Sequence, residues 1–84
     1  MVKVEIYSSA LCGYCYRAKA LLRKKGIKYD EVDITFSAKK RTEMERRAKR
    51  YTVPQIFIGG KSIGGSDELH DLEYAGKLDD LLAG

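Results

Sequence analysis

The sequence is poor in several residues that mark particular classes of protein. Its 84 residues include one proline, one histidine, two cysteines and no tryptophan. We do not expect the two cysteines to form a structural disulfide, because cytosolic thiols are kept reduced. No apolar run approaches the roughly 20 residues that span a bilayer, and residues 1–10 (MVKVEIYSSA) lack a signal-peptide pattern. We therefore expect a cytoplasmic protein with no membrane partner.

Positive charge is abundant but unevenly distributed. The net charge is +4; residues 1–54 hold 14 Lys and Arg against six Asp and Glu, whereas residues 55–84 hold two against six. The densest basic stretch, KKRTEMERRAKR, has the charge expected of a nucleic-acid binder. Glu43 and Glu45 interrupt it, and no base-stacking motif accompanies it. We predict no nucleic-acid partner and assign most of this stretch to a solvated helix face.

Hydrophobic periodicity in the first half of the chain predicts a strand, a helix, a strand and a second helix. Apolar residues alternate over 2–7, and the segment 27–34 is a second strand. A helix between them ends at Gly26, a residue suited to the left-handed position after a helix. The second helix covers 38–51 with Ser37 as N-cap. The predicted inward side chains are Cys15, Ala18, Leu22, Val32, Ile34, Met44, Ala48 and Tyr51.

The second half has the pattern of a hairpin followed by helices. Two short strands flank Gly59–Gly60, which is a hairpin turn signal. A helix then begins within GGSDELHDLEYAG, with Ser66 or Asp67 as N-cap and acidic residues in its first turn. The segment KLDDLLA adds a short terminal helical piece.

This order of elements predicts one α/β domain over residues 1–84. A helix between the first two strands implies a right-handed parallel crossover, whereas the glycine hairpin implies an antiparallel pair. We therefore expect a mixed four-stranded sheet with helices on both faces.

Cys12 and Cys15 stand where the first strand gives way to the first helix. Unsatisfied N–H groups and the helix dipole favour an anion at this point, and Arg17 and Lys19 add positive charge. Because a thiol attacks as its thiolate, we expect Cys12 to be the exposed nucleophile and Cys15 the resolving thiol. A C-x-x-C pair in a βαβ context indicates redox chemistry. Two inert core thiols, or half a zinc site with the distant His70, are the alternatives.

Three motifs then occur in a specific order: CGYC, TVPQIFI and GGKSIGGSDEL. Together they resemble the glutaredoxins, specifically the small dithiol bacterial type, over essentially the whole chain. The resemblance implies a thioredoxin fold and a glutathione-dependent thiol–disulfide oxidoreductase that is a monomer. It also implies the substrates, which are protein–glutathione mixed disulfides and protein disulfides such as that of ribonucleotide reductase.

The resemblance further implies where glutathione binds. Val53, before a cis Pro54 and next to Thr52, would offer its backbone N–H and C=O to the glutathione cysteine. A structural alternative is that Pro54 simply begins an edge strand. The γ-glutamyl end would lie at Gly65, Ser66 and Asp67, and Tyr14 would form a wall of the groove.

Elementary chemistry agrees with the assignment of the γ-glutamyl end. The N–H groups of a helix N-terminus and the hydroxyl of Ser66 can bind a carboxylate. The side chain of Asp67 can pair with the ammonium group, and it can serve as an ordinary N-cap as well.

The sequence departs from this family pattern at two positions. Ser9 stands where a lysine usually meets the glycine carboxylate of glutathione, so we expect Arg41 or Arg47 to supply that charge. Gly13 replaces the more common proline of CPYC. Some glutaredoxins without that proline hold a [2Fe–2S] cluster between two copies, with one cysteine from each and two glutathiones. A cluster-binding dimer that uses Cys12 is therefore the alternative function.

Overall fold

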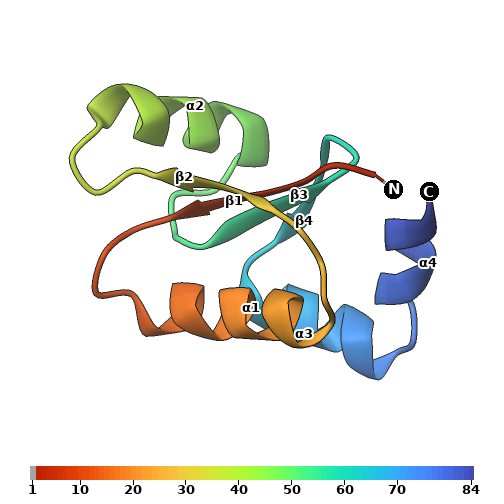
Figure 1. The fold of residues 1–84 in the computed structure, drawn as a ribbon. Coiled ribbons are helices and arrows are strands. Elements are labelled where there is room, and N and C mark those ends of the chain that lie inside the picture. The colour runs from red at the N-terminus through yellow and green to blue at the C-terminus, as the bar shows by residue number, and fades with distance from the viewer. Residues whose placement is uncertain (1) are drawn as a thin grey trace.

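Strands and helices follow one another in the order that the hydrophobic pattern predicts. The computed structural model describes residues 2–84 and is shown in Figure 1. The strands are β1 (Val4–Ser8), β2 (Asp30–Asp33), β3 (Gln55–Ile58) and β4 (Lys61–Gly64). The helices are α1 (Gly13–Lys24), α2 (Ala38–Ala48), α3 (Ser66–Tyr74) and α4 (Leu78–Ala83).

The four strands form one mixed sheet in the order β2-β1-β3-β4. Strand β1 pairs parallel with β2 and antiparallel with β3, and β3 pairs antiparallel with β4. Gly59 and Gly60 join β3 to β4 with φ values of 59° and 79°. A tight hairpin turn of this kind requires positive φ, which glycine adopts without steric cost. The predicted mixed sheet is confirmed.

Helices cover both faces of this sheet, as predicted. Helices α1 and α3 lie side by side on one face and α2 lies on the other (Figure 1). The core between the sheet and α1, α3 and α4 contains Val4, Ile6, Ala18, Leu22, Ile56, Ile58, Leu69, Leu78 and Leu82. The core beneath α2 contains Tyr7, Ile34, Met44, Ala48 and Phe57. Each helix therefore buries one apolar stripe against the sheet.

Two predicted boundaries were wrong. Helix α2 ends at Ala48 rather than continuing to residue 51, because Lys49 takes a left-handed backbone conformation (φ 60°). Tyr51 consequently lies outside the helix with an exposed side chain. Strand β2 is also shorter than predicted, although Ile34 remains buried and its N–H donates to the carbonyl oxygen of Ser8 at 2.8 Å.

The predicted N-cap of α3 was also wrong. The N-cap is Gly65 rather than Ser66 or Asp67. The carboxylate of Glu68 accepts a hydrogen bond from the Gly65 N–H at 2.6 Å, which satisfies that backbone donor. This arrangement places Ser66 and Asp67 in the first turn of α3. Within residues 2–84, no helix combines the length and apolar character needed to cross a membrane.

Candidate active site

The Cys12 sulfur caps helix α1. Its backbone is extended (φ −107°, ψ 108°), and its Sγ accepts a hydrogen bond from the N–H of Cys15 at 3.2 Å. A sulfur in this position faces a backbone donor and the positive end of the helix dipole. The Cys12 side chain is also partly exposed. It therefore occupies the environment that a nucleophilic thiolate requires.

Cys15 is different from Cys12 because α1 turns it into the core. Only 1% of its surface is exposed. Burial, together with the neighbouring Cys12, raises the pKa of Cys15 to about 12. At neutral pH this sulfur is consequently a protonated thiol that substrates cannot reach. The two sulfurs thus differ in access, because Cys12 is partly exposed and Cys15 is buried.

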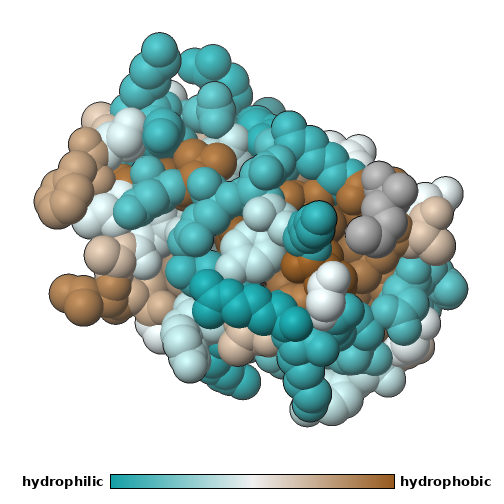
Figure 2. Space-filling view, in the orientation of Figure 1, coloured by the Kyte–Doolittle hydropathy of each residue, from teal (hydrophilic) through white to brown (hydrophobic). Residues whose placement is uncertain are grey.

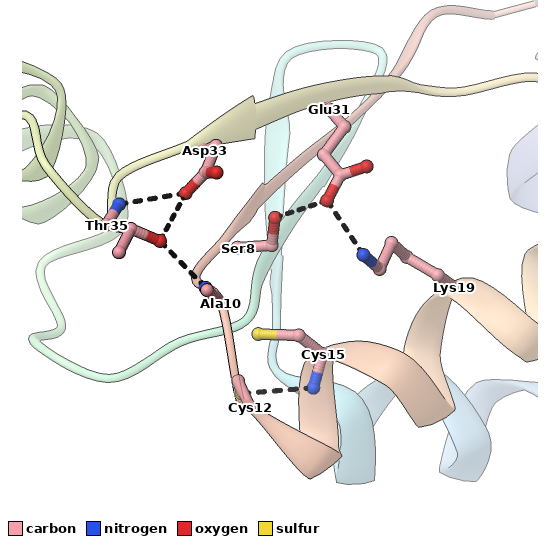
Figure 3. A network of polar contacts seen from close by, with 8 residues as sticks. All are labelled: Ser8, Ala10, Cys12, Cys15, Lys19, Glu31, Asp33 and Thr35. Carbon is pink, nitrogen blue, oxygen red and sulfur yellow. Dashed lines mark hydrogen bonds and ion pairs between the residues drawn. The ribbon is translucent and has the colours of Figure 1, made fainter.

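A polar network lies beside this pair and joins α1 to the first two strands (Figure 3). The Lys19 ammonium donates to Glu31 Oε2 at 2.8 Å, and the buried Ser8 hydroxyl donates to the same oxygen at 2.6 Å. The hydrogen bond from Lys19 lowers the pKa of Glu31. Lys19, predicted as a cation near Cys12, is therefore held by a carboxylate of β2.

A groove of about 230 Å³ runs along the other side of the α1 N-terminus. Its lining includes all seven glutathione-site residues predicted from the three motifs: Tyr14, Thr52, Val53, Pro54, Gly65, Ser66 and Asp67. The Cys12 Sγ lies 3.9 Å from the carbonyl oxygen of Val53, and the Val53–Pro54 peptide bond is cis, as expected. Segments far apart in the sequence therefore meet beside the accessible sulfur.

Sequence reasoning missed Gln55, which supports the turn before Pro54. Its side chain is fully buried, and its amide nitrogen donates to the carbonyl oxygen of Thr52 at 2.9 Å and to the Thr52 hydroxyl at 3.2 Å. Its Oε1 is buried with no hydrogen-bond partner among residues 2–84. A polar residue that opens an apolar strand, as in QIFI, is the signal that could have indicated this role.

The cation of the groove is Arg50 rather than Arg41 or Arg47. Arg50 lines the groove, and its Nη1 lies 3.1 Å from Glu68 Oε1. Arg41 is not among the lining residues; its guanidinium lies 4.0 Å from Glu45 on α2. Arg41 lies in the first turn of α2, away from the groove lining, whereas Arg50 follows the left-handed Lys49 that ends α2 and lines the groove.

Arg47 makes its contacts on the face of the sheet that α2 covers. Its guanidinium bonds both carboxylate oxygens of Glu5 at 3.1 Å and the Tyr7 hydroxyl at 2.9 Å. It also stacks 4.0 Å from the centroid of the Phe57 ring. A guanidinium with these partners stabilises the packing of α2 on the sheet and is not available to the groove.

The zinc alternative lacks a ligand cluster. Among residues 2–84, no group of three or more His, Cys, Asp or Glu side chains is placed to hold a metal ion. The ring of His70 instead has its Nδ1 2.7 Å from the carbonyl oxygen of Ser66, one turn earlier in α3.

Fold and site together define a class of protein: a thioredoxin-fold protein whose two thiols begin the first helix, one accessible and one buried. The glutaredoxin family model matches residues 4–63. The chain is 52% identical to glutaredoxin 3 of Escherichia coli K12 over 82 residues, which cover 98% of this chain and 99% of that protein. It belongs to the glutaredoxin family, whose members are thiol–disulfide oxidoreductases.

Solved structures agree with this assignment. The crystal structure of a buckwheat glutaredoxin–glutathione complex superposes with a TM-score of 0.89 at 30% identity, covering 98% of this chain and 77% of that one. A structure concerned with the metal binding of glutaredoxins has a TM-score of 0.74 at 52% identity, covering 98% and 89%.

Proposed function

We propose that this glutaredoxin uses glutathione to reduce protein–glutathione mixed disulfides and protein disulfides, with Cys12 as nucleophile and Cys15 as resolving thiol. The disulfide of ribonucleotide reductase is an example of such a protein disulfide. One observation carries the proposal: the accessible Cys12 sulfur lies 3.9 Å from the Val53 carbonyl oxygen, at the edge of a groove. The protein acts as a monomer in this cycle.

The chemistry consists of exchange steps between thiolates and disulfides. The Cys12 thiolate attacks the glutathione sulfur of the substrate; a Cys12–glutathione bond forms, the substrate disulfide breaks, and the protein sulfur leaves as a thiolate that takes a proton from water. A second glutathione thiolate then attacks the glutathione bound to Cys12, which releases glutathione disulfide and regenerates the Cys12 thiolate. The net reaction consumes one free glutathione thiol and releases one protein thiol and one glutathione disulfide.

The lining of the groove matches the chemical groups of glutathione. The backbone of Val53 can pair with the peptide groups around the glutathione cysteine, while Tyr14 and Thr52 border that segment. The first-turn N–H groups of α3 and the Ser66 hydroxyl suit the γ-glutamyl carboxylate, and the Asp67 carboxylate suits its ammonium.

Arg50 provides the cation for the remaining carboxylate of glutathione. A guanidinium binds a carboxylate through two parallel N–H donors. Arg50 is half-exposed and paired with Glu68 on one side, so it still offers donors to a ligand in the groove. We assign to Arg50 the role that the sequence suggested for Arg41.

The alternative function, a [2Fe–2S] cluster shared by two copies, draws on the same accessible sulfur. Cys15 is buried, so each copy offers Cys12 alone, and the other ligands would come from glutathione in the groove. The similarity to the structure concerned with metal binding favours keeping this candidate. When bound, the cluster supplies one-electron chemistry. Anaerobic purification with glutathione tests it: a coloured dimer supports the cluster, and a colourless monomer supports the oxidoreductase.

Covalent trapping tests the proposed function directly. Cys15→Ser protein treated with glutathione disulfide should gain one glutathione on Cys12, visible by mass spectrometry, and Cys12→Ser should gain none. Amide shifts on trapping should concentrate at the residues that line the groove. Modification without shifts at Val53 or at the N-terminus of α3 would show that glutathione does not occupy this groove.

A further inference from the structure

Two apolar side chains near the reactive cysteine are fully exposed. Leu11, which directly precedes Cys12, has a relative exposure of 106%, and Phe36, between β2 and α2, has one of 100%. Figure 2 shows apolar side chains projecting at the left edge of the molecule, over the loops that follow β1 and β2, beside a largely hydrophilic surface. We call Leu11 and Phe36 the apolar rim.

The two loops that carry the apolar rim are tied together. The Ala10 N–H donates to Thr35 Oγ1 at 2.7 Å, and the Asp33 carboxylate accepts from both the hydroxyl and the N–H of Thr35 (Figure 3). Leu11 and Phe36 are the next residues of the chain after this hydrogen-bonded pair. The two side chains of the apolar rim therefore project from loops that are fixed to each other, one of which leads directly into Cys12.

The backbone of Leu11 adds a second observation. Its φ is 58°, a left-handed conformation that residues with a Cβ adopt at a steric cost and glycine adopts freely. Because the Leu11 side chain is exposed, burial does not offset that cost. Packing within the protein gives no reason for leucine here, and such strain next to a reactive group points to a function.

Cys12 also borders a hollow on this side of α1. The hollow measures about 420 Å³ and is lined by residues from the β1–α1 loop and the start of α1, including Leu11, Cys12, Tyr16 and Lys19. The glutathione groove has a different set of lining residues. Two hollows with different linings therefore lie near Cys12, and they can take the two halves of an attacked disulfide.

We infer that the apolar rim binds the polypeptide that flanks the disulfide of a protein substrate, and that it selects segments with apolar side chains beside the cysteine. Cysteine is among the most buried residue types, so a chain segment that exposes its cysteine to an enzyme exposes apolar neighbours as well. The inference rests on the proposed function, because it assumes that glutathione binds in the groove. The protein half of the substrate then binds at the apolar rim.

Three substrates test this inference. Two are synthetic peptides with one glutathionylated cysteine, flanked by Leu and Phe in one and by Gly and Ser in the other; the third is the mixed disulfide of glutathione and 2-mercaptoethanol, which has no peptide beyond the leaving sulfur. We expect the wild type to prefer the apolar peptide over the Gly/Ser peptide. Leu11→Ala and Phe36→Ala should each lower kcat/KM on the apolar peptide roughly threefold, and together about tenfold. Turnover of the 2-mercaptoethanol disulfide should not change.

Tyr74→Ala and Lys49→Gly are the matched controls for the changes at the apolar rim. Tyr74→Ala removes an exposed aromatic side chain (88% exposed) at the far end of α3 and should leave all three substrates unaffected. Leu11→Gly and Lys49→Gly both relieve a positive φ, so both should keep or raise the melting temperature. Only Leu11→Gly should lose the preference for the apolar peptide.

Each failure has a separate signature. Equal losses on all three substrates would show that the rim supports the site itself, and an unchanged peptide preference would show that it binds no polypeptide; either result overturns the inference. If the wild type reduces none of the substrates, the proposed function fails. The apolar rim can then still be tested by binding, because a serine analogue of the apolar peptide should shift the NMR signals of Leu11 and Phe36. A dimer that the double variant abolishes would assign the rim to a second copy and overturn the inference.

Discussion

The Cys12 sulfur accepts a hydrogen bond from the Cys15 backbone N–H at 3.2 Å, so the two cysteines are related as the N-cap and the third residue of one helix. This relationship separates their chemistry. The cap position leaves the Cys12 sulfur at the surface, whereas the helical turn carries the Cys15 side chain into the core. A three-residue spacing at a helix start therefore produces one attacking thiol and one protected thiol.

Alkylation rates should reveal this asymmetry. In the reduced, folded protein at pH 7, iodoacetamide should modify Cys12 in Cys15→Ser at least a hundredfold faster than Cys15 in Cys12→Ser, because burial raises the Cys15 pKa to about 12 and blocks access. Guanidinium should remove most of the difference. Comparable rates in the folded protein would contradict the assignment.

The same raised pKa has a consequence for stability at high pH. An unfolded thiol has a pKa of about 8.5, so the Cys15 contribution to folding is complete below that pH and is lost as the pH rises toward 12. Reduced wild type should lose stability between pH 9 and 11 more steeply than Cys15→Ala, as chemical denaturation at each pH would measure. If the free energy of unfolding falls equally with pH in wild type and in Cys15→Ala, the conclusion that Cys15 is a buried, neutral thiol is wrong.

Substrates of two kinds should separate the roles of the thiols. A mixed disulfide with glutathione needs Cys12 alone, whereas an intramolecular protein disulfide traps Cys12 and needs Cys15 to resolve the intermediate. Cys15→Ser should keep or raise deglutathionylation and lose most protein-disulfide reduction; Cys12→Ser should lose both. Equal losses on both substrates for Cys15→Ser would reject this division.

Local sequence signals predicted much of this molecule. The alternation of residues 2–7, the helical face of Cys15, Ala18 and Leu22, and the Gly59–Gly60 turn are each encoded within a few residues. The redox pair was predicted for the same reason, because C-x-x-C spacing and a helix start lie together in the chain.

Features that depend on tertiary geometry were not predicted. Arg50 reaches the groove because Lys49 ends α2 in a left-handed conformation, and the helical pattern of KKRTEMERRAKRY gave no sign of this stop. Gln55 supports Thr52 through buried hydrogen bonds, although its residue type suggests exposure. Arg50 pairs with Glu68 from a distant segment, whereas Gln55 bonds Thr52 three residues earlier and is buried by the surrounding core. In neither case does the residue type indicate the contact.

Asp67 should contribute to the affinity for glutathione. Because its side chain is exposed on α3, an ion pair between Asp67 and the glutathione ammonium would be worth about 0.5–1 kcal/mol. Asp67→Ala should therefore raise the KM for glutathione roughly two- to fivefold with kcat little changed. Asp71→Ala, one turn further along the same helix, is the matched control and should leave KM unchanged. A KM that stays constant in folded Asp67→Ala would remove this residue from the site.

Proline should fit at position 13. Gly13 is the first residue of α1, where a helix needs no backbone N–H donor, and a Cβ built there meets nothing within 4 Å. The extended backbone of Cys12 also suits a following proline. Gly13→Pro should stabilise the reduced protein by about 0.4–1 kcal/mol by restricting the unfolded chain, whereas Gly13→Ala should give a smaller gain. A lower melting temperature for Gly13→Pro would contradict this view of the helix start.

Arg50 and Arg41 together test where the groove obtains its positive charge. Arg50 lines the groove, whereas Arg41 faces Glu45 on α2 and does not. Arg50→Gln should raise the KM for glutathione about threefold to tenfold, in keeping with one charged hydrogen-bonding partner, and the effect should shrink at high salt. Arg41→Gln removes the same charge from the protein and should leave KM within about twofold. Because Arg50 also bonds Glu68, thermal unfolding must show that Arg50→Gln is folded. A larger KM change for Arg41→Gln than for Arg50→Gln would return the role to α2 and reject the assignment of Arg50.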